Sequence, residues 1–332
     1  MHPLREGHKV DMTEQAKENG PRFIEIDTHD SGQRIDNFLI TRLKGMPKSR
    51  IYRLLRKGEV RVNKGRIKAH YRLRAGDRIR LPPMTLPARA REEENPEVQM
   101  MGRRLEACIL YEDDGLLAIN KPSGMPVHGG SGLQGGVIEG LRQVRPEARF
   151  LELVHRLDKD TSGCLLIAKR KQALRELHRI FREDQVDKRY LALLNGVGRR
   201  RREMVDVSLR KFVLHGGERF VKVDREGKPS RTEFRTLERF TEATLVEARL
   251  LTGRTHQIRV HAAYLGHPIL GDTRYGDEEA NRLWRQRGLK RLFLHAWRLA
   301  LPHPAGGSPL RLEAPLDADL EHLLEHLKKG GS

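Results

Sequence analysis

A break in composition at residues 83–104 divides the chain into a short block and a long one. Prolines recur in this segment and residues 92–94 are three consecutive glutamates, a composition that is typical of a linker. A length of 332 residues also exceeds that of an average domain. We therefore predict two domains, at residues 22–82 and 105–328. Residues 1–21 are polar and highly charged, and we predict that they are disordered.

The long block combines strand and helix patterns without a regular alternation. Apolar runs such as 164–168 and 244–251 are typical of buried strands, whereas residues 137–144 and 172–181 have helical spacing. Turn sequences such as Asp113-Asp114-Gly115 indicate hairpins between neighbouring strands. The pattern predicts an α+β domain with a mixed, mainly antiparallel sheet, and it argues against a doubly wound α/β fold.

The short block has the pattern of two small helices and a small sheet. Ile35, Phe38 and Leu39 fall at helical spacing, as do Ile51 and Leu54 in a second helix. The other face of the second helix and the strand that follows it are cationic, and they carry Arg50, Arg53, Arg56, Lys57 and Arg61. Such a face is either a solvated surface or a contact surface for nucleic acid. Because few acids interrupt it, we predict a small α/β RNA-binding module.

The charge of the whole chain supports a polyanionic partner. Lys and Arg number 64 against 45 Asp and Glu, a formal net charge of +19, and such an excess favours nucleic acid as the partner. No apolar run approaches the ~18 residues of a membrane-spanning helix, and the N-terminus lacks the apolar segment of a signal peptide. We therefore expect a cytoplasmic protein that does not bind a membrane.

Cysteine and histidine spacing argues against a metal site. Cys108 and Cys164 are the only two cysteines, and they do not form the closely spaced pair that structural zinc sites use. His256, His261 and His267 lack the spacing of the H-E-x-x-H motif. We therefore expect neither a disulfide framework nor a bound metal.

The candidate site lies in the polar loop of residues 155–163, between two apolar runs. The loop contains His155, Arg156, Asp158 and Asp160. A loop held by strands on both sides can fix side chains rigidly in a cleft. It can equally be a surface loop whose charges pair with one another, and physical reasoning from the loop alone leaves both interpretations open.

A resemblance distinguishes between them. The string H-R-L-D-K-D-T-S-G at 155–163 is similar to the central motif of the RluA-type pseudouridine synthases. Segments 120–124, 188–192 and 252–261 resemble further motifs of that family, and the short block resembles the S4 RNA-binding domain. The opening at 32–39 is similar to that of synthases acting on the large ribosomal subunit. The resemblance thus implies that uridines of 23S (large-subunit) ribosomal RNA are the substrate.

The family reaction assigns tasks to three residues. It breaks the N1–C1′ bond of uridine, rotates the detached uracil and joins C5 to C1′, so the resemblance implies neither cofactor nor metal. Asp158 is implied as the catalytic carboxylate and Arg259 as its ion-pair partner. Tyr190 is implied as the residue that stacks on the uracil and assists with the C5 proton.

Four further residues are implied in substrate binding. Arg156 enters the base stack when the uridine flips out, a step that costs a few kcal/mol in a duplex. Ile258 forms an apolar wall, and His155 and Asp160 orient the loop. The expected partner is ribosomal RNA or the pre-ribosomal large subunit, and the sequence requires no state beyond a monomer. Two alternatives are a non-catalytic RNA-binding or ribosome-assembly protein and a synthase acting on tRNA.

Overall fold

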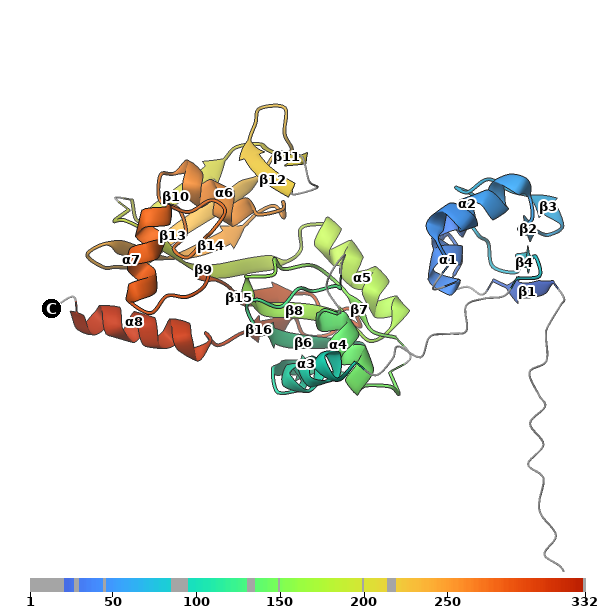
Figure 1. Ribbon diagram of the computed structural model, residues 1–332, viewed down its shortest axis with the longest axis horizontal. Helices are drawn as coiled ribbons and strands as arrows, with labels where there is room; N and C mark the ends of the chain where they lie inside the picture. The colour runs from blue at the N-terminus through green and yellow to red at the C-terminus, as the bar shows by residue number, and fades with distance from the viewer. Residues whose placement is uncertain are drawn as a thin grey trace, which may run out of the picture. The chain divides into compact units, whose positions relative to one another are not determined.

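The computed structural model describes residues 21–26, 30–43, 46–84, 95–129, 135–148, 150–198, 200–213 and 219–330 (Figure 1). The chain divides into two compact units between residues 93 and 94. The predicted disordered segment 1–21 lies outside the described residues, apart from its last residue.

The first unit has two helices and a four-stranded antiparallel sheet in the order β1-β4-β2-β3. Its elements are β1 (Arg22–Glu25), α1 (Ile35–Arg42), α2 (Lys48–Lys57), β2 (Arg61–Val62), β3 (Gly65–Arg66) and β4 (Arg78–Leu81). Ile51, Leu54 and Leu55 of α2 are buried in a core that α1 and the sheet complete. Helix α2 ends at Gly58, whose φ of +69° is a left-handed conformation that favours glycine. The prediction of two short helices and a small sheet is confirmed.

The second unit is built on one mixed sheet, whose main path is β10-β13-β14-β9-β15-β8-β6-β5. Strand β16 pairs with β15, and β7 pairs with β8. The pair β15–β8 is parallel and the other described pairs are antiparallel. This confirms the predicted mixed, mainly antiparallel sheet. The strands are β5 (Ile109–Glu112), β6 (Leu116–Lys121), β7 (Glu152–Leu153), β8 (Ser162–Ala168), β9 (Asp187–Asn195), β10 (Arg202–Asp206), β13 (Arg231–Arg239), β14 (Ala243–Leu250), β15 (Leu294–Leu301) and β16 (Leu310–Glu313).

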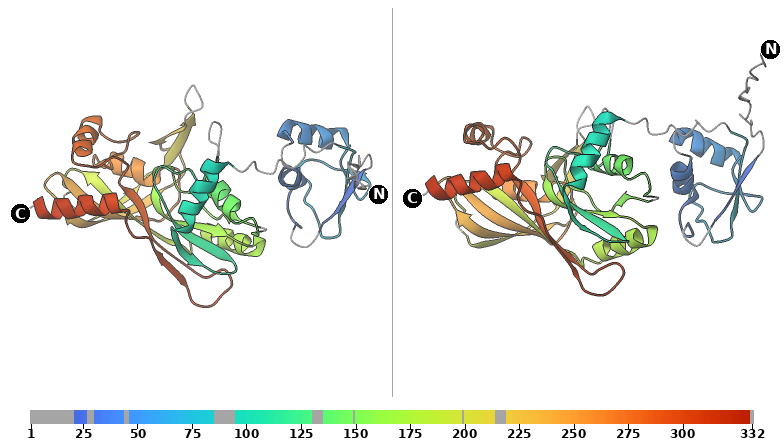
Figure 2. Two further views of the ribbon diagram at one scale, coloured as in Figure 1. Left: turned by 60° about the horizontal axis from the view of Figure 1, so that its bottom comes forward. Right: turned by 90° about the horizontal axis from the view of Figure 1, so that it is seen from below.

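Helices cover both faces of this sheet (Figures 1 and 2). The helices are α3 (Pro96–Glu106), α4 (Val137–Val144), α5 (Lys171–Arg182), α6 (Gln257–Tyr264), α7 (Glu278–Gln286) and α8 (Ala318–Gly330). Leu117 and Ile119 of β6 pack with α4, whereas Leu116 and Ala118 pack with α5, because successive side chains of a strand point to opposite faces. A separate two-stranded hairpin consists of β11 (Leu209–Val213) and β12 (Arg219–Val223).

Helix α3 corrects the prediction that residues 83–104 form a linker, because residues 96–104 of that segment are helical. The Asn95 side chain caps the helix by accepting the backbone N–H groups of Glu97 and Val98. Pro96 occupies the first turn, where a proline loses no helical hydrogen bond. A Cβ on Gly102 would lie 2.3 Å from the carbonyl oxygen of Gly140, so α3 packs very closely on α4. This part of the chain therefore belongs to the core of the second unit.

Two further observations concern the described residues as a whole. None of their helices is long and apolar enough to cross a membrane. They also contain no group of three or more His, Cys, Asp or Glu side chains placed to hold a metal ion.

Candidate active site

The central feature of the site is a cavity of about 450 Å³ where three segments of the second unit meet. The loop 154–161, between β7 and β8, brings Asp158 into the cavity. Tyr190 comes from β9, and the segment 251–256 leads into α6, which contributes Ile258 and Arg259. The structure thus brings together residues that are about a hundred positions apart in the sequence.

Asp158 lies at the boundary between this cavity and a buried cation. Arg259 Nη1 donates a hydrogen bond to Asp158 Oδ2 at 3.3 Å. The Asp158 side chain is 30% exposed, whereas that of Arg259 is 8% exposed. One end of the ion pair is therefore open to a ligand in the cavity, and the other is fixed in the protein interior.

Asp272 is a site residue that the sequence analysis missed. Its two carboxylate oxygens accept the Nε and Nη2 protons of Arg259 at 2.7 and 2.8 Å, and its Oδ1 also accepts the backbone N–H groups of Arg274 and Tyr275. Burial works to raise the pKa of Asp272, but the guanidinium and the backbone donors outweigh burial and hold that pKa below its ordinary value. An isolated aspartate in a loop gives no specific signal in the sequence.

Tyr190 lies between two hydrophobic clusters of the second unit. One cluster contains Leu157 of the Asp158 loop, and the other contains Ile258 of α6. Burial raises the pKa of the Tyr190 phenol, and the nearby charge of Asp158 raises it further. The hydroxyl therefore keeps its proton at neutral pH, and the ring can serve as an apolar surface for a planar ligand.

The predicted substrate-binding residues occupy different places. Arg156 is exposed at the cavity, and Ile258 is buried in its wall. His155 lines the cavity too, but its Nε2 accepts the backbone N–H of Leu166 at 3.1 Å. Its ring stacks on Phe181 at a centroid distance of 5.2 Å. Burial lowers the pKa of His155 to about 4. The ring is therefore neutral at pH 7, and its contacts with Leu166 and Phe181 hold the loop in place.

Asp160 was predicted to orient the loop among the substrate-binding residues. It is exposed and does not line the cavity. Its backbone carbonyl accepts the hydroxyl of Ser123 at 2.7 Å, which ties the Asp158 loop to the segment after β6. The backbone of Asp160 thereby helps to hold the loop, and its place in substrate binding stays a prediction.

Lys121 also holds this loop, and the sequence analysis did not single it out within segment 120–124. Its side chain is fully buried, and Nζ donates to the carbonyl oxygens of Pro122, Met125 and Lys159 at 2.8, 2.9 and 3.0 Å. Burial lowers the pKa of this amine to about 7. One side chain thereby links the end of β6 to the loop that carries Asp158.

The predicted RNA-binding side chains of the first unit are all exposed to solvent. Arg50, Arg53, Arg56 and Lys57 are all exposed on α2, opposite its buried apolar face. Arg61 is exposed on β2, and its Nε donates to the carbonyl oxygen of Gly58 at 3.3 Å. The arrangement presents several cations on one side of the unit, as contact with a phosphate backbone requires.

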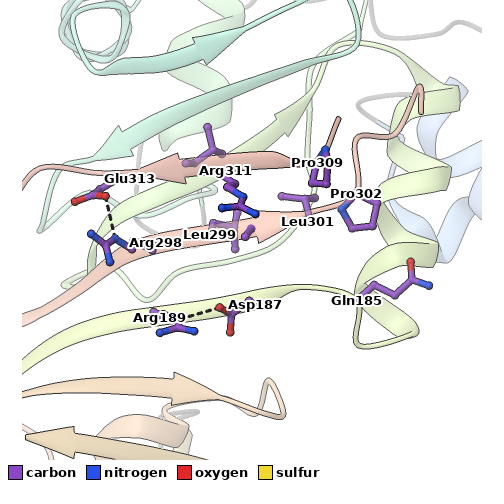
Figure 3. A pocket seen from close by; sticks show the side chains of 12 residues that line it. Gln185, Asp187, Arg189, Arg298, Leu299, Leu301, Pro302, Pro309, Arg311 and Glu313 are labelled. Atoms are coloured by element: carbon purple, nitrogen blue, oxygen red, sulfur yellow. Dashed lines mark hydrogen bonds and ion pairs between the residues drawn. The ribbon is translucent and has the colours of Figure 1, made fainter. Parts of the chain in front are cut away.

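A second cavity, of about 660 Å³, lies away from Asp158 between β9 and the β15–β16 hairpin (Figure 3). Asp187 and Arg189 of β9 line it, and they alternate along the strand with Tyr190, so this cavity opens on the other face of β9. Its carboxylates are engaged, since Asp187 pairs with Arg189 at 2.7 Å and Glu313 pairs with Arg298 at 2.9 Å. Although larger, it is lined by none of the residues predicted for the active site.

Comparison with known proteins identifies the family of the chain. A family model described as RNA pseudouridylate synthase matches residues 115–264, and the S4 domain model matches residues 33–79. The "Ribosomal large subunit pseudouridine synthase C" of Escherichia coli strain K12 is 55% identical over 309 residues, which cover 92% of this chain and 97% of that protein. The chain belongs to the RNA pseudouridylate synthase family. The same-named protein of Haemophilus influenzae is 51% identical over 96% of this chain and 99% of its own length.

Solved structures agree with this assignment to the pseudouridylate synthases. Human RNA Pseudouridylate Synthase Domain Containing 4 superposes with a TM-score of 0.59 at 29% identity, covering 70% of this chain and 97% of that one. Human RNA Pseudouridylate Synthase Domain Containing 1 gives 0.53 at 29% identity, covering 66% and 94%. The resemblance in the sequence is therefore confirmed, and the chain is an RNA-modifying isomerase with an S4 domain. The alternative of a non-catalytic RNA-binding protein is wrong.

Proposed function

We propose that this enzyme isomerises specific uridines of 23S (large-subunit) ribosomal RNA to pseudouridine, with Asp158 as its catalytic carboxylate. The observation that carries the proposal is the placement of Asp158 at a cavity, beside Tyr190 and hydrogen-bonded to the buried Arg259. The named relatives that match nearly the whole chain act, by their names, on the large ribosomal subunit.

Each residue contributes to holding and converting the flipped uridine. The uracil stacks on Tyr190 against the apolar wall formed by Ile258, and Arg156 at the mouth of the cavity enters the base stack that the uridine leaves. Asp158, hydrogen-bonded to Arg259, supplies the negative charge that the cleavage of the N1–C1′ bond requires. All bonds broken and formed lie within one nucleotide, so the proposed reaction needs no redox group and no hydrolytic water.

The S4 domain binds the RNA outside the active site. The exposed cations of α2, among them Arg53 and Arg56, would neutralise backbone phosphates without reading the sequence. We place the enzyme in the cytoplasm, with ribosomal RNA or the pre-ribosomal large subunit as its partner and a monomer as its working state.

The test compares the wild-type enzyme with Asp158→Asn in cells that lack the gene. Pseudouridines are mapped across ribosomal RNA and tRNA, and the affinity of each purified protein for a ribosomal RNA fragment is measured. We expect the wild type to restore sites in 23S RNA, and Asp158→Asn to restore none while binding RNA normally. Near-normal restoration by the variant would contradict the role of Asp158. Restoration of sites only in tRNA would contradict the proposed substrate.

A further inference from the structure

His256 is a cavity residue to which neither the family reaction nor the motif has given a task. It precedes α6 as its N-cap, and its φ of +53° places it in the left-handed region. Non-glycine residues adopt this conformation rarely, and it is found at functional sites when the surroundings enforce it. The side chain is 13% exposed and lies in the cavity, with Nε2 3.8 Å from Asp158 Oδ2.

The other ring nitrogen of His256 is held by Tyr275. Tyr275 Oη accepts the backbone N–H of Val221 on β12 at 3.1 Å, and it lies 2.8 Å from His256 Nδ1. We assign the hydroxyl proton of Tyr275 to the contact with Nδ1, so that Tyr275 accepts from Val221 and donates to a neutral imidazole. In this tautomer the single ring proton lies on Nε2, on the side that faces Asp158.

The charged groups around this ring favour its neutral form. Burial lowers the pKa of His256, and the cations Arg259 and Arg274 lower it further, while Asp158 and Asp272 oppose them. A neutral ring can donate a hydrogen bond to a carboxylate without adding a second positive charge beside it.

The contacts that the structure gives for the Asp158 carboxylate, within the described residues, engage one oxygen. Arg259 Nη1 and His256 Nε2 both face Oδ2, at 3.3 and 3.8 Å. Oδ1 is therefore the oxygen left available to the cavity. The His256 contact is longer than a hydrogen bond, as catalytic contacts often are before substrate binds.

We propose that His256 is a positioning residue that, with Arg259, holds Oδ2 of Asp158 so that Oδ1 is the oxygen that reacts. Tyr275 fixes the tautomer of the ring, and the β11–β12 hairpin fixes Tyr275 through Val221. The inference rests on the proposed role of Asp158, and it adds the residue that orients this carboxylate and the atom that it presents to the uridine.

The test distinguishes the effect of the hydrogen-bond donor on His256 Nε2 from the effect of the left-handed backbone conformation at this position. In His256→Gln the side-chain amide nitrogen can take the place of Nε2, whereas in His256→Asn the shorter amide ends near the position of Nδ1. Asparagine tolerates the left-handed backbone better than glutamine, so a purely conformational role would favour His256→Asn. We expect the opposite order, with single-turnover rates reduced less than about tenfold in His256→Gln and about 100-fold in His256→Asn, a loss typical of a catalytic group misplaced by about 1 Å.

The affinity for a ribosomal RNA fragment is measured on the same proteins and should stay within about twofold of wild type. A loss confined to affinity, a rate of His256→Asn equal to or above that of His256→Gln, or wild-type rates in both variants would each overturn the proposal. Asp158→Asn in the same assay separates this outcome from a failure of the proposed function, because loss of turnover there is expected whatever His256 does.

Tyr275→Phe tests whether Tyr275 fixes the tautomer of His256, since the substitution removes only the hydroxyl. We expect a reduced single-turnover rate in the wild-type background and no further reduction in the His256→Gln background. The hydroxyl of Tyr275 acts on Asp158 through the ring of His256, and phenylalanine keeps the ring that lies 5.1 Å from the Arg259 guanidinium. Equal losses in both backgrounds would contradict that coupling.

His267→Gln is the matched control, since this histidine bonds the carbonyl oxygen of Asn195 and does not line the cavity. Thermal unfolding of every variant shows whether it is folded.

Discussion

The buried pair of Arg259 and Asp272 makes a quantitative prediction for Asp272→Asn. The substitution keeps the shape of the side chain but places an amide N–H₂ or a neutral oxygen against guanidinium donors at 2.7 and 2.8 Å. Removing one charge of a buried ion pair costs about 3–5 kcal/mol, because the remaining charge stays buried without compensation. The amide oxygen can keep the two backbone N–H bonds to Oδ1, so we expect the lower end, about 3 kcal/mol.

Thermal unfolding followed by tryptophan fluorescence measures this loss, because both tryptophans, Trp284 and Trp297, lie in the second unit. In a domain of this size 1 kcal/mol corresponds to roughly 2–4 °C, which predicts a Tm about 6–12 °C lower. Glu313→Gln is the control, because its pair with Arg298 joins side chains that are 55% and 45% exposed. Surface pairs of this kind contribute about 0–1 kcal/mol.

The pH dependence of the loss follows from the lowered pKa of Asp272. The ordinary pKa of the carboxyl group is 3.8 and the folded value lies below it. The ionised carboxylate therefore stabilises the fold above about pH 4, and that contribution disappears as the pH falls through the folded value. The difference in unfolding free energy between wild type and Asp272→Asn should be constant from about pH 5 to 8 and shrink below pH 4. Equal stability at pH 7, or a difference that grows in acid, would refute the reasoning.

Three further predictions concern single side chains. Tyr190→Phe keeps the ring and loses the hydroxyl, so the single-turnover rate should fall by about 10²-fold or more if the phenol assists proton transfer, with RNA affinity unchanged in a binding assay. The double variant Arg53→Gln, Arg56→Gln should lower the slope of log affinity against log salt by about 1.4–1.8, at about 0.7–0.9 for each phosphate that the protein no longer neutralises. Burial lowers the pKa of Lys121 to about 7 from an ordinary 10.5. Between about pH 7 and 10.5 the unfolded chain therefore binds more protons at this amine than the folded protein does. The free energy of unfolding should therefore rise with pH across that window, and Lys121→Met should flatten the rise.

Much of the fold could be predicted because its strands and helices carry local signals. Helix α4 was predicted at residues 137–144 and is observed at those residues, and the run at 164–168 lies within the fully buried β8. Helix α3 was missed although Asn95 and Pro96 form a standard helix start. The prolines and glutamates before it dominated the composition, and the packing of α3 on α4 is a tertiary contact that composition does not contain.

The candidate site could be predicted only where its residues lie in recognisable motifs. Asp158, Tyr190 and Arg259 were found in that way, and the structure brings them together at one cavity. Asp272 could not be found, because its importance depends on a guanidinium 13 residues away in the sequence. The task of His256 depends in turn on the backbone conformation and on Tyr275, neither of which a motif specifies.

The arrangement of charges explains why one arginine is shared by two carboxylates. A nucleophilic carboxylate has to remain ionised, yet a bidentate pair with arginine would occupy both of its oxygens. Asp272 takes the two shorter hydrogen bonds from Arg259, at 2.7 and 2.8 Å, and the Nη1 group bonds Asp158 at 3.3 Å. His256 faces the same oxygen of Asp158 as a neutral ring. The Asp158 carboxylate is thereby held through one oxygen, which agrees with the proposal that its other oxygen faces the uridine.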